Sequence, residues 1–151
     1  MKKVAVLVAL VVIMPSTVLM ASEQDENVQN LVNAALTFFQ EKGPDYSVKA
    51  FNALGGPFVK GPLYVFAGTL EGRMLAHPFD KSLLEKNLLE VKDTNGKLLF
   101  QEMIAAAKGQ GEGWVDYMWP HPGTKEATQK RSYIKRVPSQ DIWLGAGYYV
   151  K

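Results

Sequence analysis

Trp114-Val115-Asp116-Tyr117-Met118-Trp119 is a run of aromatic and branched residues, which is typical of a β-strand. Because successive side chains of a strand point to opposite faces, Val115, Tyr117 and Trp119 share one face and the other three residues share the opposite one. One of the two faces must be the inner one. The run therefore predicts a strand whose aromatic side chains reach the interior of the protein.

Two further β-rich runs follow, over residues 129–137 and 142–150, and proline-containing turns separate the three runs. Short runs joined by such turns predict an antiparallel meander at the C-terminal end of the chain. Gly145 and Gly147 lie inside the last run. They fit a strand whose backbone bends or passes close to a ligand.

A hairpin is expected upstream of the meander. Residues 63–67 form a β-branched and aromatic run, and Glu71-Gly72 is a turn signal. Residues 73–76 then pair back as the second arm. His77 is therefore placed just past the end of the hairpin.

A long helix precedes the hairpin, because apolar residues recur at helical spacing over residues 28–39 with polar residues largely between them. Ser22 or Asp25 can cap its start. Lys42-Gly43-Pro44 ends it, since glycine accepts the left-handed terminal conformation and proline cannot continue a helix. A short amphipathic piece follows over residues 48–54.

Shorter helices are predicted between the hairpin and the meander. Asp80 can cap a helical turn over residues 82–84, and Asp93-Thr94-Asn95-Gly96 is a turn signal before a helix over roughly 97–108. A calcium loop would continue with spaced oxygen ligands, whereas apolar residues follow here. The order of elements predicts an α+β fold built on an antiparallel sheet.

The N-terminal segment has the features of an export signal. Two lysines precede an unbroken apolar run over residues 4–14, which is shorter than the about 20 residues of a membrane-spanning helix. Ala21-Ser22 offers a cleavage point. We predict a signal peptide over residues 1–21 and one periplasmic or secreted domain over residues 22–151, with an uncleaved N-terminal anchor as the alternative.

Composition argues against several kinds of site. The chain has 17 basic and 15 acidic residues, and removal of the two N-terminal lysines leaves 15 of each. Nucleic-acid binding needs a clear positive stripe. The nearest candidates are diluted by acidic residues and are interpreted first as solvated strand ends: Lys125, Lys130, Arg131, Lys135 and Arg136. With no cysteine and two isolated histidines, no metal site and no cofactor are predicted.

Several motifs occur in one order along the chain, after the long helix. They are Gly61-Pro62-Leu63-Tyr64-Val65-Phe66, Leu75-Ala76-His77-Pro78, Asp93-Thr94-Asn95-Gly96-Lys97, residues 111–120, Lys130-Arg131-Ser132-Tyr133-Ile134 and Trp143-Leu144-Gly145-Ala146-Gly147-Tyr148-Tyr149. This order resembles the single Cache family of extracellular sensor domains, whose fold is PAS-like. The resemblance covers nearly all of residues 22–151.

The resemblance implies a long N-terminal helix packed on a central antiparallel sheet of five or six strands. It also implies a small ligand held between the sheet and its covering loops, often an organic acid such as acetate, propionate or pyruvate. Relatives usually sit in chemoreceptors and sensor kinases. We therefore expect a stand-alone exported sensor domain, not an enzyme, with a membrane-bound receptor or kinase as a further partner.

The family motif suggests that Tyr117 and Trp119 line the pocket, where a phenol and an indole N–H are polar groups on apolar walls. The alternative for each aromatic side chain is ordinary packing in the core.

Lys130 is the best candidate to meet a carboxylate, because a buried ammonium needs an anionic or hydrogen-bonding partner. Tyr64 and Tyr133 can donate hydrogen bonds to the same ligand. His77 can donate from one ring nitrogen and accept with the other. Arg73 is expected to be exposed near the hairpin turn.

Two other functions remain open at this stage. The first is an exported interaction protein that contacts a membrane receptor or kinase and has a vestigial pocket. The second is a hydrolase or lyase in which His77 works with Asp80 or Asp116, although no catalytic motif supports it.

Overall fold

The computed structural model describes residues 16–150, and side-chain environments from Glu23 onward. Its helices are α1 (Ser16–Lys42), α2 (Pro44–Phe51), the 3-10 turn η1 (Lys81–Leu83) and α3 (Leu99–Lys108). Its strands are β1 (Val59–Lys60), β2 (Leu63–Thr69), β3 (Met74–Ala76), β4 (Glu112–Pro120), β5 (Ala127–Arg136) and β6 (Ile142–Tyr149). The predicted α+β order is confirmed.

The six strands form one antiparallel sheet in the order β1-β2-β6-β5-β4. β3 pairs with Ala67 and Gly68 of β2, whereas β1 pairs with Leu63 and Tyr64 of the same strand. The predicted hairpin is β2 and β3, and the predicted meander is β4, β5 and β6. β6 returns to the middle of the sheet, because it pairs with β5 on one side and with β2 on the other.

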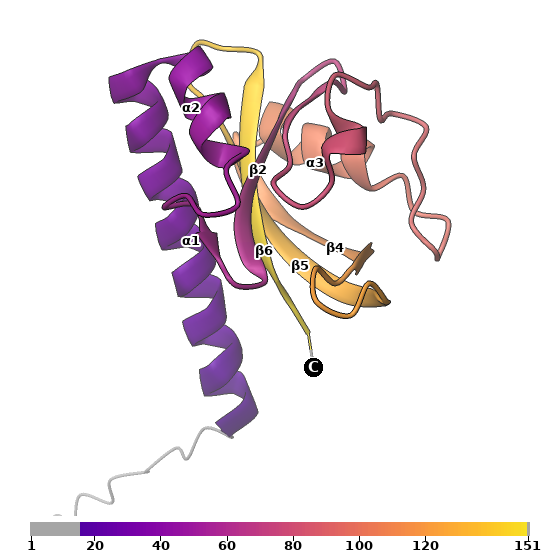
Figure 1. Cartoon of the computed structure of the whole chain (residues 1–151). Coiled ribbons are helices and arrows are strands. Elements are labelled where there is room, and N and C mark those ends of the chain that lie inside the picture. Colours follow the sequence, from indigo (N-terminus) through magenta and orange to yellow (C-terminus); the bar gives the residue numbers. More distant parts are fainter. Residues whose placement is uncertain (1–15, 151) are drawn as a thin grey trace, which may run out of the picture.

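The sheet separates two layers of core. α1 lies along one face and α3 covers the other (Figure 1). On the α1 face, Val28, Leu31, Val32, Ala35 and Phe39 form the buried stripe that the helical spacing predicted, and it packs on inward residues of β2 and β6. The α3 face buries a second cluster, which includes Val115 and Tyr117 of β4. The predicted alternation along β4 is confirmed.

The junction of α1 and α2 differs from the prediction at its start and agrees at its end. α1 begins at Ser16 and is continuous through Ser22 and Asp25, so neither residue caps the helix. Gly43 has a φ of 79°, and Pro44 opens α2 four residues before the predicted piece. Proline suits the first position of a helix because the missing N–H would have no partner there.

The predicted signal peptide lies largely outside the described residues, since the description starts at residue 16. None of the helices within residues 16–150 combines the length and the hydropathy that crossing a membrane requires.

Candidate functional site

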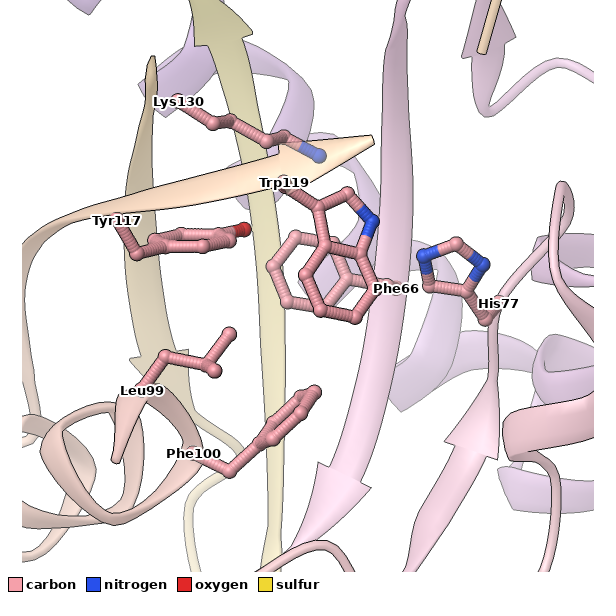
Figure 2. Close-up of a pocket in the computed structure, with 7 residues that line it drawn as sticks. All are labelled: Phe66, His77, Leu99, Phe100, Tyr117, Trp119 and Lys130. Atoms are coloured by element: carbon pink, nitrogen blue, oxygen red, sulfur yellow. The ribbon is translucent and has the colours of Figure 1, made fainter. Parts of the chain in front are cut away.

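A small cavity lies between the sheet and α3. Its volume is about 10 Å³, which is room for about one water molecule. Seven side chains line it: Phe66, His77, Leu99, Phe100, Tyr117, Trp119 and Lys130. Figure 2 shows Lys130 at one end, Leu99 and Phe100 at the other, and aromatic rings between them. Four of the six residues predicted for the ligand site therefore lie around one cavity.

Lys130 is fully buried, with 0% of its surface exposed. It projects from β5, and its ammonium crosses β6 to lie 3.9 Å from the ring centroid of Tyr64 on β2. The rings of Phe66 and Tyr149 are its next aromatic neighbours, at 5.1 and 5.2 Å. No carboxylate of the described residues forms an ion pair with it. Burial holds the pKa of Lys130 well below its ordinary value.

The first interpretation of Lys130 as a solvated strand end is therefore wrong. Its neighbour Arg131 points to the other face and pairs with Asp25 and Asp116. The alternation of side chains along β5 separates the two cations, so that one reaches the cavity and the other reaches α1.

Tyr117 and Trp119 project from β4 into the cavity, as the family motif suggested. The Tyr117 hydroxyl lies 3.0 Å from the Ser132 hydroxyl, and either group can donate. Burial raises the pKa of Tyr117, so its hydroxyl keeps its proton near neutral pH. The Trp119 ring packs against His77 and Phe100 and closes the space between them.

His77 is held in one tautomer. The Asp80 backbone N–H donates to Nδ1 at 2.9 Å, so Nδ1 has no proton in the neutral ring and Nε2 carries it. Nε2 lies 3.2 Å from the Tyr64 hydroxyl and donates to it. That hydroxyl keeps its own proton for another acceptor, because burial raises the pKa of Tyr64. Tyr64 thus adjoins the cavity through His77 and the Lys130 ammonium.

Burial and, secondarily, the positive charge of Lys130 lower the pKa of His77 to about 3. Because the unfolded chain binds a proton near pH 6.5, acidification from there to about pH 3 favours unfolding. We expect this histidine to cost about 1.4 kcal/mol of stability for each pH unit in that window. Denaturant unfolding of wild type and His77→Gln at pH 7, 5.5 and 4 measures it. The stability advantage of wild type should shrink with falling pH, and a constant difference would contradict the assignment.

Tyr133 is the predicted site residue that the structure removes from the cavity. It lies in the α1-side core and its ring packs on Trp114, its partner on β4. Lys130 and Tyr133 are three positions apart on a strand, so their side chains point to opposite faces. The expectation that both meet one ligand is corrected on this ground.

Neither of the two carboxylates that could assist His77 in catalysis forms a hydrogen bond or an ion pair with it. Asp116 pairs with Arg131 on the other face of the sheet. The Asp80 carboxylate turns to Ser82, whose N–H and hydroxyl donate to it at 2.9 and 2.6 Å, which confirms Asp80 as a cap. Arg73 pairs with Glu85 in an exposed position, as expected.

Sequence reasoning missed three lining residues, Phe66, Leu99 and Phe100. Phe66 lies in the predicted strand over residues 63–67, and Leu99 and Phe100 lie in the predicted helix over residues 97–108. The spacing of apolar residues indicates that such side chains are buried, but it does not show which cavity they line. Within residues 16–150, no group of three or more His, Asp or Glu side chains is arranged to hold a metal ion.

A surface depression of about 130 Å³ adjoins the cavity and shares the side chains of His77 and Trp119 with it. Its other walls include Asp80 and Lys125. His121 also lines the depression, and its Nδ1 accepts the Gly123 N–H at 3.1 Å. The depression places His77 and Trp119 between the cavity and solvent.

Sequence comparisons relate the chain to sensory proteins. The family model described as the Cache domain matches residues 16–151. The methyl-accepting chemotaxis protein McpP of Pseudomonas putida is 36% identical over 87 residues, which are 58% of this chain and 16% of that protein. The sensor histidine kinase MctS of Rhizobium johnstonii is 29% identical over 87 residues, 58% of this chain and 19% of that protein. The matched region is thus less than a fifth of each relative.

Solved structures agree with the sequence comparisons. A Cache chemosensory domain described for carboxylic acid recognition is 28% identical, with a TM-score of 0.77, and the match covers 91% of this chain and all of that one. The periplasmic sensor domain of a chemotaxis protein is also 28% identical, with a TM-score of 0.68 over 87% of this chain and 98% of that one.

A methyl-accepting chemotaxis protein from Vibrio parahaemolyticus shares the fold at 21% identity, with a TM-score of 0.77 over 90% of this chain and 95% of that one. The predicted arrangement of one long N-terminal helix on a central antiparallel sheet is therefore confirmed. The chain belongs to the Cache domain family, and its described residues form a single PAS-like sensor domain.

Proposed function

We propose that this domain binds a small carboxylate in the cavity of Figure 2 and senses it for a signalling partner. One observation carries the proposal: the Lys130 ammonium is fully buried, faces aromatic rings and has no carboxylate beside it among the described residues. A buried cation is costly unless an anion or hydrogen bonds accompany it. A ligand carboxylate is the partner that this position lacks.

The polar groups around Lys130 support an anionic ligand. The Tyr64 hydroxyl accepts a hydrogen bond from His77, so its own proton is not used in that bond and can be donated to a ligand. Tyr117 can also donate, with Ser132 as its alternative partner. These groups and the ammonium converge from β2, β4 and β5, and hydrogen bonds to a charged group are the stronger kind.

The size of the cavity favours the smallest acids, and we propose acetate, propionate or pyruvate as ligands. Each is larger than one water molecule, so some walls must move apart when it binds. His77 and Trp119 are the walls nearest to solvent, because they also line the adjoining depression.

The relatives support a role in signalling. The solved domain described for carboxylic acid recognition supports the ligand class, and the chemotaxis protein and the histidine kinase support a sensory context. We propose that the domain works outside the cytoplasm, like the periplasmic sensor domain that it resembles, and that a membrane-bound receptor or kinase reads its state.

We expect acetate, propionate or pyruvate to raise the melting temperature, because a ligand that binds only the native state adds about 2.7 kcal/mol at a hundredfold excess over Kd. Tyr117→Phe should weaken binding at least about 10-fold, since a hydrogen bond to a charged group contributes about 1.5–3 kcal/mol. Thermal-shift titration of wild type and variant measures both effects.

Tyr133→Phe is the matched control, because Tyr133 is a buried tyrosine on the opposite face of the same sheet. Tyr133→Phe also removes one buried tyrosine hydroxyl, but it should leave the affinity for the acid unchanged. If no acid stabilises the wild-type protein, the carboxylate proposal is wrong and a vestigial pocket takes its place. Equal weakening by both variants would contradict the placement of the ligand.

A further inference from the structure

The two ends of the cavity differ in chemistry. At one end lie the Lys130 ammonium and the polar groups of His77 and Tyr117. At the opposite end, Leu99 and Phe100 project from the start of α3 with only carbon atoms at their tips (Figure 2). Both side chains are buried, so the far end of the cavity is closed by hydrocarbon.

The start of α3 is tied to the strand that carries Tyr117 and Trp119. In the loop before the helix, one Asp93 carboxylate oxygen accepts from Asn95 and Lys97 backbone N–H groups, each at 2.9 Å. The other oxygen accepts from the Met118 N–H of β4, also at 2.9 Å. Burial acts to raise the pKa of Asp93, but these three hydrogen bonds together outweigh it and hold the pKa below its ordinary value.

A second connection comes from Lys97, whose ammonium donates to the Asp116 carbonyl of β4 at 2.6 Å. Because helix and strand are joined on both sides of the turn, Leu99 cannot move away from Tyr117 without breaking hydrogen bonds. The distance between the polar end and the apolar end of the cavity is thereby set.

We propose that Leu99, with Phe100 beside it, determines the chain length of the acid that this domain accepts. The inference rests on the proposed carboxylate function. An acid whose carboxylate meets Lys130 directs its tail at Leu99, so each added carbon is pressed against a closed hydrocarbon wall. A second carboxylate at the tail would be buried there without a cation, which excludes dicarboxylates.

Calorimetric titration with acetate, propionate, butyrate and valerate tests the proposal on wild type and Leu99→Ala. The wild-type affinity should be highest for acetate or propionate and fall at butyrate. Leu99→Ala should raise the affinity for butyrate relative to that for acetate roughly 10-fold, because each newly buried methylene contributes about fourfold. Leu99→Val, which removes less of the side chain, should give a smaller shift in the same direction.

Met103→Ala is the matched control. Met103 is fully buried one helical turn further along α3 and belongs to the same core cluster, but it does not line the cavity. The relative affinities of Met103→Ala for the four acids should equal those of wild type. An unchanged profile in both Leu99 variants, or the same shift in Met103→Ala, would overturn the role of Leu99 while carboxylate binding stands. If no acid binds any of these proteins, the proposed function itself fails, and the inference fails with it.

Discussion

Lys130→Met is expected to raise the melting temperature of the protein by about 3–10 °C and to abolish carboxylate binding. Methionine fills nearly the same volume without a charge, and the position is fully buried among aromatic rings. Replacing a buried charge by a well-packed apolar group commonly stabilises a protein by about 1–3 kcal/mol. The attraction between the ammonium and the Tyr64 ring is lost, which offsets part of this gain.

The stability that Lys130→Met gains over wild type should depend on pH, and the pKa of Lys130 determines the direction. Burial lowers this pKa in the folded protein, whereas the unfolded chain keeps the ordinary value of 10.5. Between these two pKa values the unfolded chain therefore binds more protons than the folded protein. Wild-type stability therefore rises with pH through this window, and the advantage of Lys130→Met shrinks. The advantage is largest below the folded pKa, where both states are protonated.

Thermal unfolding and calorimetry of both proteins between pH 6 and 10 measure these effects. Lys135→Met is the control on the same strand, because Lys135 lies near the surface and pairs with Glu112. Exposed pairs contribute about 0–1 kcal/mol, so this variant should change little. A Lys130→Met protein that is less stable than wild type, or that still binds acid, would remove the basis of the proposed function.

Gly147→Ala is expected to destabilise the protein by about 3 kcal/mol or more, which lowers the melting temperature by roughly 10 °C. A Cβ at Gly147 would lie 2.1 Å from the Ser132 hydroxyl oxygen and 2.4 Å from the Arg131 carbonyl oxygen. The carbonyl belongs to the backbone of β5, which pairs with β6 at this point, so the clash can be relieved only by separating two central strands.

This substitution should also weaken ligand binding, because Ser132 is the hydrogen-bond partner of the Tyr117 hydroxyl. Gly55→Ala is the matched control, since a Cβ there meets no atom within 4 Å. Gly145→Ala should fall between the two, because its nearest contacts are the ends of the Ile134 and Phe66 side chains at 2.8 Å. Chemical denaturation of the three variants ranks their free energies of unfolding. If Gly147→Ala is as stable as wild type, β5 and β6 do not approach each other closely at Gly147.

The glycines of β6 show how far a sequence pattern reaches. Their position inside the run fits a strand whose backbone bends or passes close to a ligand. In the structure, neighbouring strands supply the close contacts, and Phe66 and Ile134 meet above Gly145. Strand pairing across the sheet decides which atoms lie there, and local propensity carries no information about it.

The amino-acid sequence by itself determined the order of elements, the buried stripe of α1, the two faces of β4 and the Asp93 turn, because each depends on periodicity or on residues close in the chain. Alternation could also have separated Tyr133 from Lys130. Only the tertiary structure decided that Lys130 is buried, that it lies over Tyr64, and that Leu99 and Phe100 close the opposite end of the cavity. Lys130 of β5 meets Tyr64 of β2 because β6 lies between these two strands in the centre of the sheet, and Leu99 and Phe100 reach the cavity because α3 packs on β4.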